Sequence, residues 1–206
     1  MPANYDSAAW FYDRLAALVF GNALDSAQQS LLTYISDNSK ILIVGGGSGK
    51  ILEWLAKTHS SALNITFIEI SEKMTNIARK RNLGNNKVEF IIAAAEEVKL
   101  STDYDIIITS FLFDNFNGET LSHLFNHINR SLKHGGIWLN TDFQLTGKWW
   151  QGFLLKSMLL FFRVLCGVQS KQLPDIDSIF RDGGYELFDK TTFYGEFIVS
   201  TAYCKK

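Results

Sequence analysis

The sequence predicts an α/β fold: a doubly wound, mostly parallel seven-stranded sheet with an antiparallel edge hairpin. Five short runs rich in Ile, Val, Leu and Phe alternate with longer helical patterns, as in parallel sheets that are covered by helices on both faces. Two further apolar runs near the end of the chain flank a Tyr-Gly turn and are expected to pair as a hairpin. The 206 residues, 47% hydrophobic and 20% charged, suffice for one domain with a sizeable core.

Each element follows from its own stretch of sequence. The parallel strands are expected at KILIVGGG, NITFIEI, KVEFIIAA, YDIIITSF and GGIWLNTDF, which begin at Lys40, Asn64, Lys87, Tyr104 and Gly135. YELFDKTTF and EFIVSTAYCKK are expected to form the hairpin. Helices are expected over 50–59, 71–83 with Ser71 as N-cap, 118–132, from about 149, and over 174–180. A single domain over 1–206 is therefore expected, with an N-terminal helical cap at 1–38 and an apolar helical insertion at about 146–173.

Charge and cysteine content narrow the classes of function. Twenty Lys and Arg against twenty-one Asp and Glu give a net charge of −1, so no nucleic-acid partner is expected. Two cysteines, Cys166 and Cys204, are too few for a disulfide framework. The N-terminal stretch carries the charged residues Asp6, Asp13 and Arg14 where a secretory signal would be apolar. These features predict a cytoplasmic protein.

The segment ILIVGGGSGKILEWL is typical of a ligand-binding loop. A buried strand ends in four glycines within five residues, and a helix begins at once. Glycines let backbone N–H groups approach a ligand closely, and the helix N-terminus favours negative charge. The spacing excludes the dinucleotide fingerprint, whose third glycine would fall on Lys50 or Leu52, and it excludes the phosphate-binding P-loop, because Val44 and Ile51 stand at two of its required positions.

The remaining pattern, Gly45-x-Gly47-x-Gly49 followed by Glu69 at the end of the next strand, resembles the class I S-adenosylmethionine-dependent methyltransferases of the small-molecule type. FIEISEKM, VEFIIAAAEEV, YDIIITSFLF, INRSLKHGGIWLNTDF and FRDGGYEL are similar, in order, to later segments of that family. The resemblance implies the seven-stranded class I fold and S-adenosylmethionine as cofactor, with S-adenosylhomocysteine as product.

The resemblance also implies the cofactor-binding residues, with Glu69 accepting hydrogen bonds from the ribose. They are Gly45, Gly46, Gly47, Gly49, Glu69, Ile70, Ala94, Ala95, Glu96, Ser110 and Phe111. The chain departs from the family pattern at Ile43 and Ala94, where acids are common. The rival hypothesis is therefore a protein that keeps the fold and the cofactor site but no longer transfers a methyl group.

The expected reaction is direct in-line displacement at the sulfonium methyl group, with a small, apolar or aromatic acceptor. A general base is needed only if the acceptor must lose a proton. Asp114 and Asp142 follow the fourth and fifth strands and are the candidate bases, although each could instead cap a helix or turn. No metal is expected, because His123 and His127 lack a third ligand.

Aromatic residues in two regions are candidates to contact the acceptor: Tyr5, Tyr12, Phe113, Trp149 and Trp150. The last two begin the apolar helix 149–168, for which three interpretations remain open. It is a lid over the acceptor, a homodimer interface, or an in-plane anchor that contacts a membrane surface. A membrane-spanning helix is disfavoured by Lys156 and Arg163.

Overall fold

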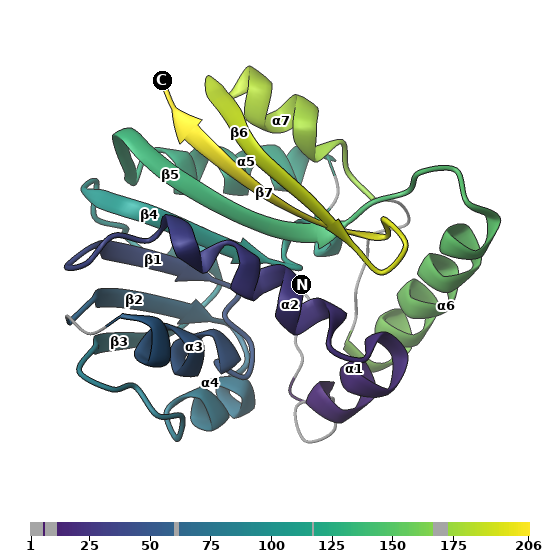
Figure 1. Ribbon diagram of the computed structural model, residues 1–206, viewed down its shortest axis with the longest axis horizontal. Helices are drawn as coiled ribbons and strands as arrows, with labels where there is room; N and C mark the ends of the chain where they lie inside the picture. Colours follow the sequence, from purple (N-terminus) through teal and green to yellow (C-terminus); the bar gives the residue numbers. More distant parts are fainter. Residues whose placement is uncertain (1–5, 7–11, 60–61, 117, 167–172) are drawn as a thin grey trace.

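One seven-stranded sheet organises the computed structural model, which describes residues 6, 12–59, 62–116, 118–166 and 173–206 (Figure 1). The strand order is β3-β2-β1-β4-β5-β7-β6. The strands are β1 (Lys40–Val44), β2 (Asn64–Glu69), β3 (Lys87–Ile92), β4 (Tyr104–Ser110), β5 (Leu132–Phe143), β6 (Tyr185–Phe193) and β7 (Ile198–Lys205). β1 to β5 pair in parallel, and β7 pairs antiparallel with both β5 and β6. The predicted sheet with its antiparallel edge hairpin is confirmed.

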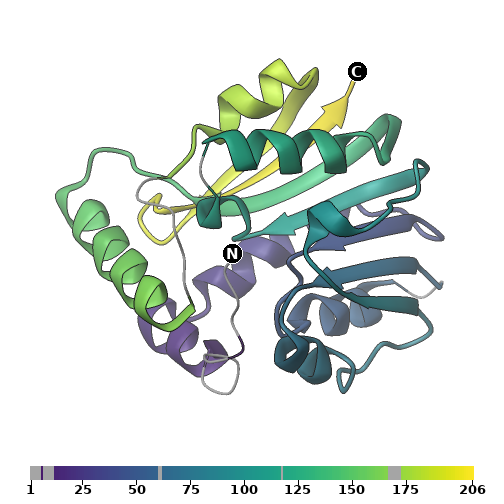
Figure 2. The ribbon, with the colours of Figure 1, turned by 180° about the vertical axis from the view of Figure 1, so that it is seen from behind.

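Helices lie on both faces of this sheet, as its apolar strands predict. The α-helices are α1 (Tyr12–Phe20), α2 (Ala23–Ser30), α3 (Lys50–Thr58), α4 (Glu72–Ala78), α5 (Gly118–Asn129), α6 (Trp149–Cys166) and α7 (Ile176–Asp182). Single 3-10 turns stand at η2 (Leu32–Tyr34), η3 (Ala95–Glu97) and η4 (Phe113–Asn115). α2 and α3 lie over one face, and α5 and α7 lie over the other (Figure 2).

The strands divide their apolar side chains between two cores. Ile41, Ile43 and other side chains on one face of the sheet pack under α3 and the end of α2. Leu42, Val44 and other side chains on the opposite face pack under α5 and α7. The second core is aromatic: the Trp138 ring stacks on Phe125 with centroids 5.0 Å apart. A buried strand has both of its faces in a core, which explains why these runs read as continuous apolar segments.

Several element boundaries differ from the sequence prediction. The fifth strand begins at Leu132, three residues before the expected Gly135, and α5 ends at Asn129 instead of residue 132. The cause is a turn in which Ser131 Oγ and N–H both donate to the Ile128 carbonyl, after which Leu132 pairs with Tyr104. α4 also ends early, at Ala78, although Ser71 caps its first turn as predicted, by accepting from the Met74 N–H at 3.1 Å.

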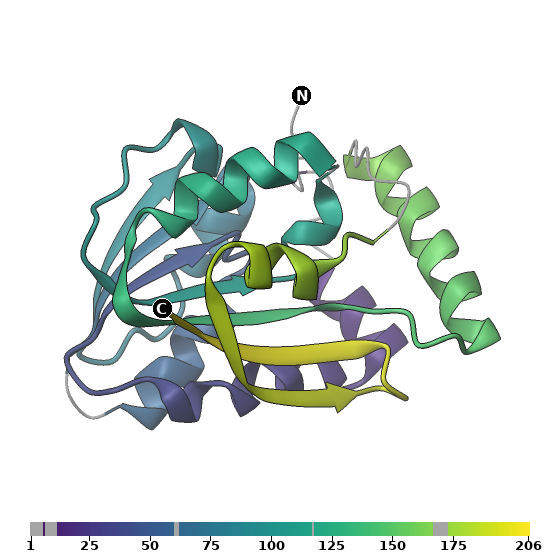
Figure 3. The same cartoon turned by 90° about the horizontal axis from the view of Figure 1, so that it is seen from above.

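The C-terminal ends of the parallel strands meet the helices α1 and α2, whereas α6 projects beyond β5 at the side of the molecule (Figure 3). Phe20, Phe143, Phe197 and Leu155 form a third apolar cluster that joins α1, α6 and the tip of the β6–β7 hairpin. In the described part of the chain, no helix has both the length and the apolar character needed to cross a membrane.

The aromatic core gives a stability prediction. Phe180 is fully buried and stacks on Tyr203 with ring centroids 3.9 Å apart. Phe180→Ala should therefore lower the free energy of unfolding by about 3–5 kcal/mol, since a cavity would remain. Urea denaturation measures the loss. Phe153→Ala is the matched control, because that ring is 72% exposed and its removal should change stability by less than about 0.5 kcal/mol. Equal losses in both variants would contradict this assignment of the core.

Candidate active site

A cavity of about 400 Å³ opens at the C-terminal ends of β1, β2 and β4. Its walls come from the glycine loop after β1, the end of β2, the segment after β3 and the segment after β4. Helices α1 and α2 close it on the remaining side. Ligands of open α/β sheets bind at this edge, so the cavity is the candidate site.

The loop glycines serve different purposes. Gly45, Gly47 and Gly49 have φ angles of 68°, 58° and 74°, which L side chains rarely adopt. A Cβ at Gly46 would lie 2.1 Å from the Phe67 ring, and one at Gly49 would lie 2.5 Å from Ala78 Cβ. A Cβ at Gly47 would meet no protein atom within 4 Å. Gly47 therefore faces the open cavity, while Gly46 and Gly49 allow close packing.

Glu69 joins the loop to the end of β2. Its Oε2 accepts from the Gly47 N–H at 2.9 Å, and its Oε1 accepts from the Ser71 N–H at 2.8 Å. Burial raises the pKa of this carboxyl group, and the two N–H donors partly offset that rise. Each carboxylate oxygen can accept more than one hydrogen bond, so Glu69 can still accept from the hydroxyl groups of a ligand.

The cavity brings together nearly all of the predicted cofactor residues. Ile70, Ala94, Ala95, Glu96, Ser110 and Phe111 line it with Glu69 and the first three loop glycines, whereas Gly49 does not. Phe111 has a φ of 52°, and its N–H donates to the Thr141 carbonyl at 2.7 Å. A bulky residue held in this conformation is strained, and such strain concentrates at functional sites.

Three of the predicted acceptor residues, Phe113, Trp149 and Trp150, do not line the cavity. Phe113 is fully buried between Trp138 and Phe180, because η4 turns its ring into the aromatic core. Trp149 is 85% exposed on α6, and Trp150 packs on Phe197. Tyr5 lies outside the described residues, as does the side chain of Tyr12, the first residue of α1.

Other residues occupy the place that was expected for these aromatics. Beyond β4 the wall consists of Leu112, Asn115, Phe116 and Thr120, and the cap supplies Asp13, Ala16, Leu24, Asp25 and Gln28. Leu112 belongs to the segment YDIIITSFLF that resembles the family, and Asn115 follows the fourth strand as a candidate near the acceptor, whereas no motif of the sequence indicated Phe116 or Thr120. For the cap, the available signal was an amphipathic helix pair that carries acids on one face.

The two candidate bases, Asp114 and Asp142, lie close enough to each other to interact electrostatically. Asp142 is buried on β5, its Oδ1 accepts from the Phe143 N–H at 2.9 Å, and burial raises its pKa to about 7. Burial and the nearby charge of Asp142 raise the pKa of Asp114 well above its usual range. Neither side chain lines the cavity. Two carboxyl groups so placed hold at least one proton near neutral pH.

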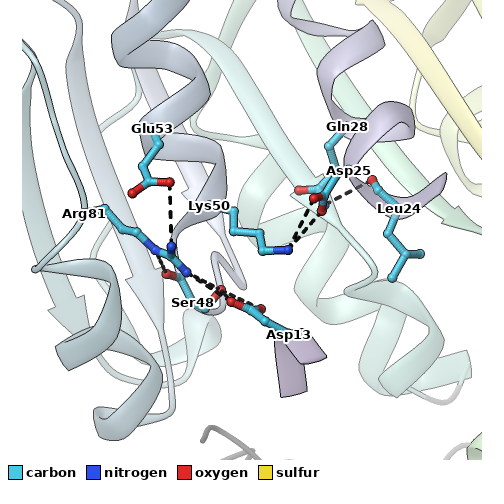
Figure 4. Close-up of polar contacts among 8 residues, drawn as sticks. All are labelled: Asp13, Leu24, Asp25, Gln28, Ser48, Lys50, Glu53 and Arg81. Carbon is cyan, nitrogen blue, oxygen red and sulfur yellow. Dashed lines mark hydrogen bonds and ion pairs between the residues drawn. The ribbon is translucent and has the colours of Figure 1, made fainter. Parts of the chain in front are cut away.

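Polar contacts tie the cap to the glycine loop (Figure 4). Ser48 Oγ donates to both carboxylate oxygens of Asp13, at 2.9 and 3.0 Å. Arg81 donates to Asp13 Oδ2 and to the Ser48 carbonyl, each at 3.0 Å, and lies 3.6 Å from Glu53 Oε2. Beside this network, Lys50 Nζ lies 3.3 Å from both carboxylate oxygens of Asp25. α1 and α2 are therefore each anchored by an ion pair.

Nothing in the described ranges forms a metal-binding group of three or more His, Cys, Asp or Glu side chains. His127 Nε2 is instead within 2.9 Å of the Val98 carbonyl oxygen. Separately, the glycine loop and the acids of the cavity wall offer backbone N–H groups and carboxylates that can bind a polar ligand.

Comparison with known proteins agrees with this geometry. Residues 41–136 match the methyltransferase domain family. The chain is 27% identical to the malonyl-[acyl-carrier protein] O-methyltransferase of Priestia megaterium over 140 residues, which are 68% of this chain and 50% of that protein. It is 32% identical to the enzyme of the same name from Acetivibrio thermocellus over 134 residues, 65% of this chain and 43% of that one. This chain thus matches about half the length of these relatives.

Solved structures show the same fold. One is the magnesium protoporphyrin IX methyltransferase of Synechocystis, solved with bound S-adenosylhomocysteine. Its comparison with this chain gives a TM-score of 0.71 at 16% identity, over 98% of this chain and 97% of that chain. The family match spans β1 to the middle of β5 and so includes the glycine loop and Glu69. Residues 41–136 of this chain therefore match a methyltransferase domain, and the chain shares the fold of solved methyltransferases.

Proposed function

We propose that this chain transfers a methyl group from S-adenosylmethionine to a small, apolar or aromatic molecule. The observation that carries the proposal is the open space over Gly47 beside the Glu69 carboxylate. Because a Cβ at Gly47 would meet no protein atom within 4 Å, a ligand has room there. The buried acid next to Gly47 can accept hydrogen bonds from two neighbouring hydroxyl groups of that ligand.

The residues present fit this cofactor. Ala93, Ala94 and Ala95 give the segment after β3 a wall of small side chains that leaves space for a planar base. Four acids and one lysine line the cavity in its described part: Asp13, Asp25, Glu69, Glu96 and Lys50. The excess of negative charge favours a cationic ligand such as a sulfonium compound.

When bound, S-adenosylmethionine supplies a methyl group on a positively charged sulfur, which a nucleophile displaces directly. The chain's own contribution is to bind and orient the two reactants. The glycine loop and Glu69 fix the cofactor, while Phe111, Leu112 and Phe116 provide an apolar wall that excludes water next to Ser110 at the end of β4. These apolar side chains favour an apolar acceptor.

Replacement of Gly47 tests the cofactor site. Gly47→Val should abolish binding of S-adenosylhomocysteine in calorimetric titration, because its side chain would enter the space that the ligand needs. Gly184→Val is the matched control, since Gly184 also has a positive φ, 82°, with nothing within 4 Å of an added Cβ, but lies in the turn between α7 and β6.

The control variant should suffer the same backbone strain and still bind. Unchanged affinity in Gly47→Val would contradict the cofactor site. Wild-type protein that binds S-adenosylhomocysteine but methylates no apolar or aromatic acceptor would favour the rival hypothesis, a binding protein without transfer.

We further propose that the Asp114–Asp142 pair supports the fold and does not act as the base, since neither side chain lines the cavity. Folded Asp142 has a pKa of about 7 against 3.8 for an ordinary Asp. Between these values the folded chain retains a proton that the unfolded chain has lost, so the free energy of unfolding should fall as pH rises from about 4 to 7.

Asp142→Asn should reduce this pH dependence and raise the free energy of unfolding at pH 8 by about 1 kcal/mol or more. Denaturant titrations at pH 5, 6, 7 and 8 measure both effects. Asp105→Asn is a control that should lower the free energy of unfolding at pH 8 instead of raising it. The pKa of Asp105 is lowered in the folded chain, where its carboxylate accepts a hydrogen bond from Lys133. A loss of methyl transfer by 100-fold or more in Asp142→Asn, with folding intact, would instead identify a general base.

We also propose that the exposed face of α6 contacts a membrane surface rich in anionic lipid. Trp149, Phe153 and Leu160 are exposed along one side of the helix, with Lys156 among them. α6 contains no acid. Exposed aromatic side chains interspersed with cations are typical of helices that lie in the plane of a membrane interface.

Co-sedimentation with vesicles tests this surface. The wild type should bind vesicles that contain phosphatidylglycerol more strongly than pure phosphatidylcholine vesicles. Phe153→Ser and Lys156→Glu should each weaken that binding severalfold, whereas Leu187→Ser, on β6, should not change it. Absence of vesicle binding together with a dimer in light scattering would show that α6 is a homodimer interface instead.

The cellular setting follows from composition. We propose a cytoplasmic protein without a nucleic-acid partner, since the net charge is −1 and only two cysteines are present.

A further inference from the structure

Lys50 is the one cation among the described residues that line the cavity. It is the first residue of α3, directly after the glycine loop, and its ammonium group faces α2 (Figure 4). No motif of the sequence assigns it a role, and the proposed function above does not use it. A lone cation in a wall with four acids marks the place where a negatively charged ligand group can be held.

The partner of Lys50 is also in the cavity wall. Asp25 on α2 places both carboxylate oxygens 3.3 Å from Lys50 Nζ. The two side chains are 30% and 34% exposed. Both residues line the cavity. Because about a third of each side chain is exposed, a ligand in the cavity can reach both charges.

We infer that Lys50 and Asp25 bind the zwitterionic amino-acid end of S-adenosylmethionine, with Lys50 at its carboxylate and Asp25 at its ammonium group. The inference rests on the proposed function and assigns one end of the same ligand. Two opposite charges side by side match the two opposite charges of an α-amino acid, so the pair and the ligand can form two ion pairs at once.

The other acids of the wall are committed elsewhere. Asp13 accepts from Ser48 and Arg81, and Glu69 accepts from Gly47 and Ser71. Glu96 follows β3, which lies two strands from β1 in the sheet. Asp25 is thus the acid that lies beside Lys50.

The end of β1 offers no charge for this purpose. Ile43 is buried and contributes an apolar side chain to the cavity. A ligand's ammonium group above it would need an acid from another element, and α2 supplies one across the cavity. Under this assignment the cap is part of the cofactor site as well as a cover over it.

Paired ligands test the subsite. S-adenosylhomocysteine carries the amino-acid end, and 5′-methylthioadenosine has the same thioadenosine without it. Asp25→Asn and Lys50→Gln should each weaken S-adenosylhomocysteine about tenfold or more in calorimetric titration, and should leave 5′-methylthioadenosine within about twofold. Lys50→Arg keeps the charge and should restore most of the affinity.

The 5′-methylthioadenosine titration also reports whether each variant keeps a folded cavity. Glu196→Gln is the matched control, because it removes a surface ion pair with Lys148, neither residue of which lines the cavity, and it should change neither affinity. Equal losses for both ligands, in variants that melt at the wild-type temperature, would mean that the pair only ties α2 to α3 and would overturn the inference.

No loss for either ligand would overturn it as well, by showing that another group holds the amino-acid end. Both of these results require a wild type that binds the two ligands. A wild type that binds neither ligand would instead refute the proposed function, and the subsite with it.

Discussion

The hydrogen bond from the Gly47 N–H to Glu69 Oε2 is the constraint on which the site depends. It joins the loop after β1 to the end of β2, and it requires three glycines at positive φ to turn the chain toward the acid. The second Glu69 oxygen accepts from Ser71, whose own hydroxyl caps α4. One buried carboxylate thus fixes the loop and the start of the helix that follows β2. Because these contacts hold the loop in place before a ligand binds, less conformational entropy is lost on binding.

The cap depends on the same loop. Asp13 reaches Ser48 within the loop and Arg81 after α4, and Asp6 accepts from the Ser71 hydroxyl and the Lys73 N–H at the start of α4. These contacts link residues that lie 35–68 positions apart in the sequence. Partly exposed ion pairs contribute little stability one by one. Their effect here is to hold the first helix over the cavity, whose shape therefore depends on surface charges as well as on the core.

The sheet and most of the cofactor side of the cavity could be predicted from sequence, because both come from local patterns. Apolar runs mark the strands, and the glycines with Glu69 mark the loop. The acceptor side could not be predicted, because it depends on where η4 points. Phe113 turns into the core, while its neighbours Leu112 and Asn115 line the cavity. Which of these neighbouring side chains faces the cavity depends on the orientation of the 3-10 turn, and the sequence does not reveal that orientation. The contacts of Asp25 and Lys50 are likewise tertiary, since α2 and α3 are brought together only by the fold.

The acids of the cavity wall and the Asp114–Asp142 pair influence each other through their charges. Under the proposed function, the four acids that line the cavity would attract the cationic cofactor and hold the neutral sulfide product less strongly, which favours its release. The same field would raise the energy of any further anion nearby. Asp142 and Asp114 do not line the cavity but stand at the end of β5 and just after β4, and burial raises the pKa of both. A proton that the pair retains near neutral pH removes one negative charge from these strand ends. The partly neutral pair therefore repels the acids of the cavity wall less than two carboxylates would.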